Sequence, residues 1–196
     1  AIGGIILSAS HNPGGIDGDF GVKLNISNGG PAPEIITNKI FKASQLLTSY
    51  KICKIQLPDF SEYGTYPYDE TTLEIIDGLT DYSNLMEKIF DFDQISDFLK
   101  KDFSLIFDAM NAVTGPYAKN IFVEKMGLAP DCVMNGNPLK DFGGLHPDPN
   151  LTYASHLADL LLNKKSYSFG AACDGDGDRN MILGSGCFVN PSDSLA

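Results

Sequence analysis

Apolar and polar positions alternate along the chain in two different rhythms, and these predict strands and helices. Short apolar runs bounded by turn residues predict strands at 2–7, 20–27, 72–76, 104–107, 169–173 and 181–183. Apolar positions three and four residues apart predict helices at 33–48, 82–90, 94–101, 117–126 and 152–162. The alternation of strand and helix after residue 104 is typical of βαβ units, so we predict an α/β fold with a largely parallel sheet.

Three local expectations follow from the same pattern. The strand at 2–7 is apolar throughout and should be buried. The stretches 49–70 and 129–150 show no regular period and should be irregular, and Thr152 should cap the last helix. A boundary near 78–81 would divide the chain into domains at 1–80 and 81–196.

Composition narrows the class of protein. The net charge of −11 argues against a nucleic-acid partner, and no apolar run reaches the 18 residues of a transmembrane span. The cysteines at 53, 132, 173 and 187 lack metal or redox spacing, which favours reduced thiols and a cytoplasmic location. The 196 residues open on Ala-Ile-Gly without Met and stop where a helix begins, so we expect a fragment of a longer protein.

An acidic loop carries the most specific chemistry. Asp174, Asp176 and Asp178 alternate with Gly175 and Gly177 between two predicted strands. The glycines allow the chain to bend so that the three carboxylates converge, and three like charges held close together require a cation. Ligands that are all anionic oxygen suit Mg²⁺ or Ca²⁺ rather than a soft metal.

The next residue, Arg179, is the only arginine of the chain, and its planar guanidinium suits an oxyanion such as phosphate. The plainer alternative is an acidic turn capped by a solvated arginine. An EF-hand loop would need glutamate where Ser185 stands, and a haloacid-dehalogenase loop would want Thr or Val in place of Asp178. Neither of these two metal loops fits.

A second loop follows the first strand and reads Ser8-Ala-Ser-His-Asn-Pro-Gly-Gly. Ser10 and His11 have no nucleophile elbow around them, and the other histidines, His146 and His156, give no recognisable triad. An ordinary turn rich in small residues is therefore an open alternative. The strand at 20–27 carries Lys23. A structural interpretation is also open for this residue: a strand lysine whose ammonium group reaches the solvent.

The serine loop and the acidic loop together, in this order and far apart, resemble those of the α-D-phosphohexomutases. The resemblance runs along the whole chain, through segments 1–15, 28–33, 141–144, 146–153 and 190–194. It implies three-layer α/β/α domains with mixed, largely parallel sheets. By this resemblance, residues 1–80 are the later part of domain I and residues 81–196 are most of domain II. An amino-terminal segment and domains III and IV would lie outside the chain.

The resemblance also implies roles for residues. Ser10 would carry the phosphoryl group, and Asp174, Asp176 and Asp178, with an oxygen of the phosphorylated Ser10, would hold Mg²⁺. Arg179 would bind the phosphoryl group. His11 and Lys23 would lie near the reacting hydroxyl, with Lys23 as candidate general acid and base.

The implied activity is that of an isomerase. It would interconvert glucose 1-phosphate and glucose 6-phosphate through glucose 1,6-bisphosphate, with a sugar phosphate as its small-molecule partner. A mutase for mannose or N-acetylglucosamine phosphate and a non-enzymatic structural paralogue remain alternatives. The fragment alone is expected to be inactive, since half of its cleft would be missing.

Overall fold

The computed structural model describes residues 2–195, and these divide into two compact units. The first unit contains the residues up to Ile6 together with Lys23–Asp81. The second contains Leu7–Val22 together with the residues from Tyr82 onward. The serine loop therefore belongs to the same unit as the acidic loop, although the two are far apart in the sequence.

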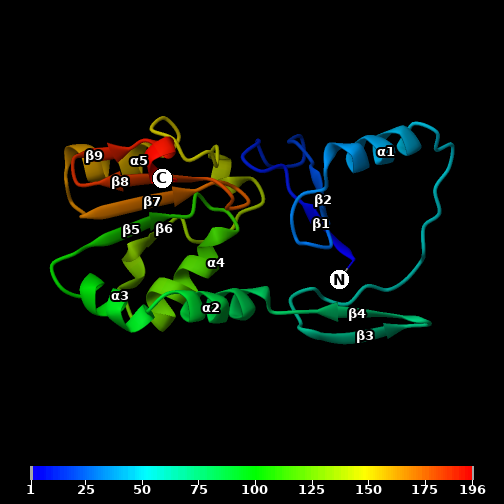
Figure 1. Cartoon of the computed structure of the whole chain (residues 1–196), viewed down its shortest axis with the longest axis horizontal. Coiled ribbons are helices and arrows are strands. Elements are labelled where there is room, and N and C mark those ends of the chain that lie inside the picture. Colours follow the sequence, from blue (N-terminus) through cyan, green and yellow to red (C-terminus); the bar gives the residue numbers. More distant parts are fainter. Residues whose placement is uncertain (1, 196) are drawn as a thin grey trace. The chain divides into compact units, whose positions relative to one another are not determined.

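The first unit is built from two small sheets and a helix (Figure 1). One sheet pairs β1 with β2, and the other is an antiparallel hairpin of β3 and β4. The elements are β1 (Gly3–Leu7), β2 (Val22–Ile26), α1 (Glu34–Ser44), β3 (Gly64–Tyr68) and β4 (Thr71–Ile75). None of the residues of α1 is buried.

Two expectations for this unit are wrong. The strand at 2–7 forms as β1, but its side chains are exposed rather than buried, because among the described residues its sheet has only two strands. Strand β3 lies inside the stretch expected to be irregular. Gly64 and Pro67 hide its strand character, yet proline is tolerated there because a two-stranded hairpin consists of edge strands alone.

The second unit holds a five-stranded sheet with the order β6-β5-β7-β8-β9 (Figure 1). Its strands are β5 (Leu105–Asp108), β6 (Val133–Met134), β7 (Phe169–Cys173), β8 (Asn180–Gly184) and β9 (Cys187–Val189). Its helices are α2 (Gly78–Ile89), α3 (Phe92–Leu99), α4 (Thr114–Ala118) with its continuation η1 (Lys119–Lys125), η2 (Pro130–Cys132), η3 (Phe142–Gly144), α5 (Ser155–Ala158) with its continuation η4 (Asp159–Asn163), and α6 (Pro191–Ser194). Both η1 and η4 are π-helical.

Strand β5 runs parallel to both β6 and β7, whereas β7, β8 and β9 pair antiparallel. The sheet is thus mixed, and less parallel than the βαβ pattern alone suggested. The chain goes from β5 to one neighbour, β6, and then crosses to the other neighbour, β7. The carboxyl ends of β5 and β7 therefore form a topological switch point, the place where open α/β sheets bind ligands.

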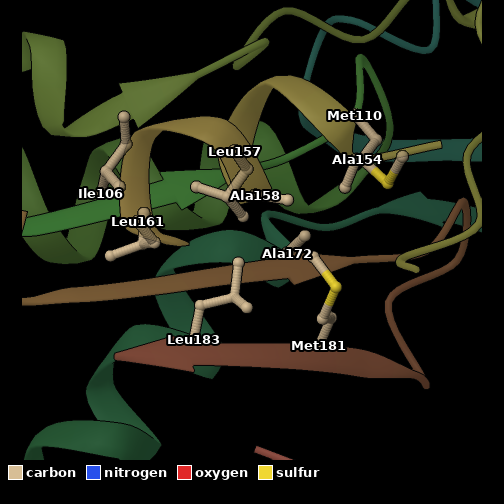
Figure 2. Packing of buried hydrophobic residues seen from close by; sticks show 9 residues of the cluster. All are labelled: Ile106, Met110, Ala154, Leu157, Ala158, Leu161, Ala172, Met181 and Leu183. Atoms are coloured by element: carbon tan, nitrogen blue, oxygen red, sulfur yellow. The ribbon is translucent and has the colours of Figure 1, made fainter. Parts of the chain in front are cut away.

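Both faces of this sheet are covered. Figure 2 shows the larger core, where Leu157 and Leu161 of the α5–η4 segment pack on Ile106, Ala172 and other buried residues of the strands. A second cluster covers the opposite face. Leu105 and Phe107, the neighbours of Ile106 in β5, point to this face because side chains alternate along a strand, and they pack against η1 and η2. The cluster comprises Ala118, Cys132 and Val133, with Leu105, Phe107, Phe122, Val123 and Leu128 around them. The second unit therefore has the expected three layers.

Two further expectations are corrected here. Strand β6 lies in the supposed loop 129–150, and its two residues are too few to show any period. Thr152 does not cap a helix; instead the side chain of Asn150 accepts hydrogen bonds from the backbone N–H groups of Thr152, at 2.9 Å, and Tyr153, at 3.0 Å. The helix then begins at Ser155. Among the helices of residues 2–195, none is long and apolar enough to cross a membrane.

Candidate active site

The acidic loop joins β7 to β8 as a tight hairpin, as the sequence predicts. Cys173 and Asn180 pair across its base, and the backbone N–H of Asp174 donates to the carbonyl of Arg179 at 3.2 Å. Gly177 has φ of +79°, a backbone conformation that glycine adopts without strain. The loop therefore bends back on itself directly at the carboxyl end of β7.

The bend brings the three carboxylates together. One oxygen from each of Asp174, Asp176 and Asp178 lies within 4.8 Å of the others, and burial decreases from Asp174, which is fully buried, to Asp178, which is exposed. Anionic oxygens grouped this closely repel one another unless a cation lies among them, and hard divalent cations prefer this donor set. The residues present therefore fit Mg²⁺ or Ca²⁺.

The serine loop is hydrogen-bonded to this cluster. The Ser10 hydroxyl donates to Asp174 Oδ2 at 2.9 Å, although 164 positions separate the two residues. The Ser8 hydroxyl donates to Asp176 Oδ2 at 2.7 Å and accepts from the Ser10 backbone N–H at 2.9 Å. Ser10 has φ of +58°, which is uncommon for a residue with a side chain and often marks a functional position.

Gly175 explains how the two loops come so close. A Cβ at this position would lie only 2.1 Å from the carbonyl oxygen of Ser10. Any side chain would therefore push the backbone of the serine loop away. The glycine between the first two carboxylates is therefore required for contact between the loops, whereas Gly177 provides the bend.

Arg179 ties the acidic loop to a third segment. Its Nε donates to Asp174 Oδ2 at 3.1 Å, its backbone N–H donates to Asp174 Oδ1 at 3.0 Å, and its Nη1 lies 3.2 Å from Asp148 Oδ1. A cavity of about 280 Å³ borders the guanidinium, and its lining includes Asp178 and Asn180. The side chain is 42% exposed, so the guanidinium is in contact with the carboxylates and also borders this cavity.

His11 lies beside the serine hydroxyl, and its Nδ1 is 3.5 Å from Ser10 Oγ. Its ring meets His146 edge-on with 6.1 Å between centroids, and His146 in turn packs against Tyr153 at 4.1 Å. Lys23 lies on β2 in the first unit and is half-buried. Its role stays a prediction. His156, expected to be structural, is exposed on α5.

Two groups near the loops, buried Asp108 and half-buried Cys173, have shifted pKa values. Asp108 ends β5, and burial raises the pKa of its carboxyl, although its Oδ1 accepts hydrogen bonds from Met110 N and Asn135 Nδ2, both at 2.9 Å. Burial, together with the charge of Asp174, raises the pKa of the Cys173 thiol to about 11. A thiol with this pKa is almost entirely protonated near neutral pH and is no nucleophile.

Sequence reasoning assigned no role to Ser8 or Asp148, yet Ser8 donates to Asp176 and Asp148 pairs with Arg179. Asp148 lies between two prolines in a distinctive motif, and this could have marked it. Ser8 offers no comparable signal, because a serine in a turn-rich loop is ordinary. Only the fold shows which of the loop serines reaches Asp176.

The comparisons with known proteins agree with this geometry. Residues 1–51 match the family model described as phosphoglucomutase/phosphomannomutase, alpha/beta/alpha domain I, and residues 80–185 match the one described as domain II. The fold thus has the α/β/α domain architecture of the phosphohexomutases. The chain belongs to the phosphoglucomutase/phosphomannomutase family.

Its relatives come from several kingdoms. The chain is 54% identical over its whole length to a phosphoglucomutase of Aspergillus fumigatus, of which it spans 36%. It is 53% identical over its whole length to a chloroplastic phosphoglucomutase of Arabidopsis thaliana, of which it spans 32%. The crystal structure of the exocytosis-sensitive phosphoprotein pp63/parafusin, a phosphoglucomutase from Paramecium, in its open form superposes with a TM-score of 0.92 at 46% identity, covering 100% of this chain and 37% of that one. The chain therefore spans about a third of the length of these relatives.

Proposed function

We propose that this chain is the serine- and metal-bearing part of a phosphoglucomutase, an isomerase that interconverts glucose 1-phosphate and glucose 6-phosphate. The observation that carries the proposal is the 2.9 Å hydrogen bond from Ser10 Oγ to Asp174, within a cluster of three carboxylates. Identity above 50% to several phosphoglucomutases supports the choice of glucose as the sugar.

In this proposal Ser10 carries the phosphoryl group. The sugar hydroxyl attacks phosphorus, the bond from phosphorus to Ser10 Oγ breaks, and a bond from phosphorus to the sugar oxygen forms. The reverse transfer, from the other position of glucose 1,6-bisphosphate, restores the phosphoserine. Such transfers depend on alignment and charge neutralisation more than on covalent help, and a loop pinned by Ser8 and Gly175 provides the alignment.

Asp174, Asp176 and Asp178, together with a phosphate oxygen on Ser10, would hold Mg²⁺, which when bound neutralises charge on the transferring group. Arg179 would bind another oxygen of the phosphoryl group, since its guanidinium already lies against Asp174. This arrangement matches what phosphoryl transfer requires: cationic groups converging on one phosphate.

The proton of the attacking hydroxyl needs an acceptor. Lys23 is the proposed general base: it takes this proton and gives it to Ser10 Oγ as the bond from phosphorus to Ser10 breaks. In the reverse step it takes the proton of Ser10 and gives it to the departing sugar oxygen. A lysine acts in this way near neutral pH only with a lowered pKa. His11, at 3.5 Å from Ser10 Oγ, would orient the hydroxyl.

The experiment uses the full-length protein in which this chain occurs. After incubation with glucose 1,6-bisphosphate and Mg²⁺, mass spectrometry should find one phosphate on Ser10. Ser10→Ala should carry none, and Ser185→Ala, which changes an exposed turn serine, should be labelled as the wild type is. An active enzyme with an unmodified Ser10 would disprove the mechanism.

Sugar preference is tested on the same preparation. We expect the highest kcat/KM with glucose 1-phosphate and lower values with mannose 1-phosphate or N-acetylglucosamine 1-phosphate. A phosphorylated protein that turns over none of these sugars would favour the structural paralogue instead.

The chain alone should turn over nothing, because by family resemblance domains III and IV complete the cleft. We also propose a cytoplasmic location, based on four free cysteines without disulfides. Several relatives are chloroplastic, so localisation of a fluorescent fusion is the direct test.

A further inference from the structure

One aromatic ring touches both catalytic loops. A Cβ on Gly14 of the serine loop would lie 2.9 Å from Cε2 and 3.1 Å from Cδ2 of Phe142. A Cβ on Gly175 of the acidic loop would lie 3.4 Å from Cζ of the same ring. The edge of Phe142 therefore faces a glycine in each loop, and neither glycine has a side chain that would hold the ring off.

We infer that Phe142 is a positioning residue that fixes the serine loop against the acidic loop. This inference rests on the proposed phosphoryl transfer. Its ring is rigid and packs against the loop that bears Ser10 and against the loop that bears the carboxylates. Surface loops are mobile when nothing packs against them, so a ring that packs against both loops restricts the distance between the serine hydroxyl and the carboxylates.

Phe142 is itself held in place by its backbone. It has φ of +54°, unusual for an aromatic residue, and its N–H donates to the Leu139 carbonyl at 3.1 Å. The side-chain amide of Asn111 donates to the Phe142 carbonyl at 3.1 Å. The backbone carbonyl of Asn111 also accepts a hydrogen bond from the backbone N–H of Leu139 at 2.9 Å. These two hydrogen bonds connect the turn at Phe142 to the loop after β5.

The loop after β5 is anchored in turn to the sheet. The Asn111 backbone N–H donates to the Asn135 carbonyl at 2.9 Å, and the Asn135 side chain donates to buried Asp108 at 2.9 Å. A continuous series of contacts thus runs from the carboxyl end of β5 to the ring of Phe142. None of these residues is among those proposed to bind the phosphate, so we assign their effect to the position of the loops.

The test compares Phe142→Ala with Phe122→Ala in the full-length protein. Phe122 is half-buried, as Phe142 is, and it packs against Phe107 in the second cluster, which contains neither catalytic loop. We expect Phe142→Ala to slow phosphoryl transfer from glucose 1,6-bisphosphate to Ser10 by about 100-fold, the effect of a misplacement near 1 Å. KM for glucose 1-phosphate should stay near the wild-type value, and Phe122→Ala should lower the melting temperature while labelling at the wild-type rate.

A second variant keeps the test decisive if Phe142→Ala lacks a cooperative unfolding transition. Asn111→Gly is compatible with the left-handed backbone, φ of +55°, and removes the side chain whose amide holds Phe142. It should slow labelling by about fivefold, the factor that one ordinary hydrogen bond represents. A wild-type labelling rate in Phe142→Ala, or in Asn111→Gly if Phe142→Ala does not fold, would overturn the inference.

Failure of the proposed function is distinguishable from failure of this inference. If the wild type takes no phosphate on Ser10, the proposed function is wrong, and crystal structures of the variant then decide the role of Phe142. We expect the Ser10–Asp174 hydrogen bond, 2.9 Å here, to be absent in Phe142→Ala. An unchanged bond would show that Phe142 positions nothing.

Discussion

Gly175→Ala is the substitution for which the structure gives the clearest magnitude. The new Cβ would lie 2.1 Å from the carbonyl oxygen of Ser10, and ordinary contact begins at 3.4 Å, so the serine loop must retreat by about 1.3 Å. That shift would break the hydrogen bond from Ser10 Oγ to Asp174 Oδ2, now 2.9 Å. A displacement of this size costs about 100-fold in rate when it separates reacting groups.

The assay has two parts, both on the full-length protein. Coupled turnover of glucose 1-phosphate gives kcat and KM, and single-turnover labelling by glucose 1,6-bisphosphate gives the rate of transfer to Ser10. Both kcat and the labelling rate should fall by about 100-fold or more. Thermal unfolding should show a destabilisation of about 1–3 kcal/mol, typical of overpacking.

Gly184→Ala is the matched control. It lies on β8 in the same unit, and its added Cβ would meet its nearest neighbour, Cys187 Cβ, at 3.7 Å, an ordinary contact. Its activity should equal that of the wild type. If Gly175→Ala kept more than half of the wild-type kcat, the contact between the two loops would have no catalytic meaning.

Three further perturbations test separate parts of the account. Arg179→Lys should lower kcat by about tenfold or more in steady-state kinetics, since an ammonium cannot contact Asp174 and Asp148 as a planar fork does; wild-type kcat would remove Arg179 from the site. Burial raises the pKa of Asp108 in the folded state, so the wild type loses stability as the pH rises from the unfolded pKa through the folded pKa. Asp108→Asn removes this titration, and its free energy of unfolding, measured with denaturant, should depend less on pH from about pH 4 upward. Superimposable pH profiles of the two proteins would contradict this. Removal of divalent cations with EDTA should lower the melting temperature, and free Mg²⁺ at 100 times its Kd should restore about 2.7 kcal/mol; Asp176→Asn should not respond, and the absence of any effect on the wild type would argue against the metal site.

The acidic loop was predictable from sequence because its whole signal is contiguous. Apolar runs flank the alternation of Asp and Gly, and the hairpin of β7 and β8 forms where they predict it. The contact between this loop and Ser10 is different in kind. It joins residues 164 positions apart, and no local pattern encodes it. Only the resemblance to known proteins suggested that they would meet.

Short or unusual strands escaped prediction for physical reasons. Strand β6 has two residues, and β3 contains a glycine and a proline, so neither shows a period or a strong propensity. The apolar strand β1 suggested burial, but burial depends on what covers a strand rather than on its own composition. Periodicity reports the preference of a segment, and the packing partners decide the outcome.

The residues that hold the site together were the hardest to predict. Ser8, Phe142 and Asn111 act through one hydrogen bond or one packed ring edge each, and their types are common in loops. Positive φ at Phe142 and Asn111 is equally invisible in the sequence. Such positions emerge only when the loops are seen against the sheet that anchors them.

The central claim is that the Ser10 phosphate and the three carboxylates share one divalent cation. Phosphorus NMR of the full-length phosphoprotein tests it most directly, with paramagnetic Mn²⁺ substituted for Mg²⁺. Mn²⁺ should broaden the phosphoserine resonance beyond detection in the wild type, and the resonance should persist in Asp176→Asn. A sharp phosphoserine resonance in Mn²⁺-saturated wild-type protein would contradict the account.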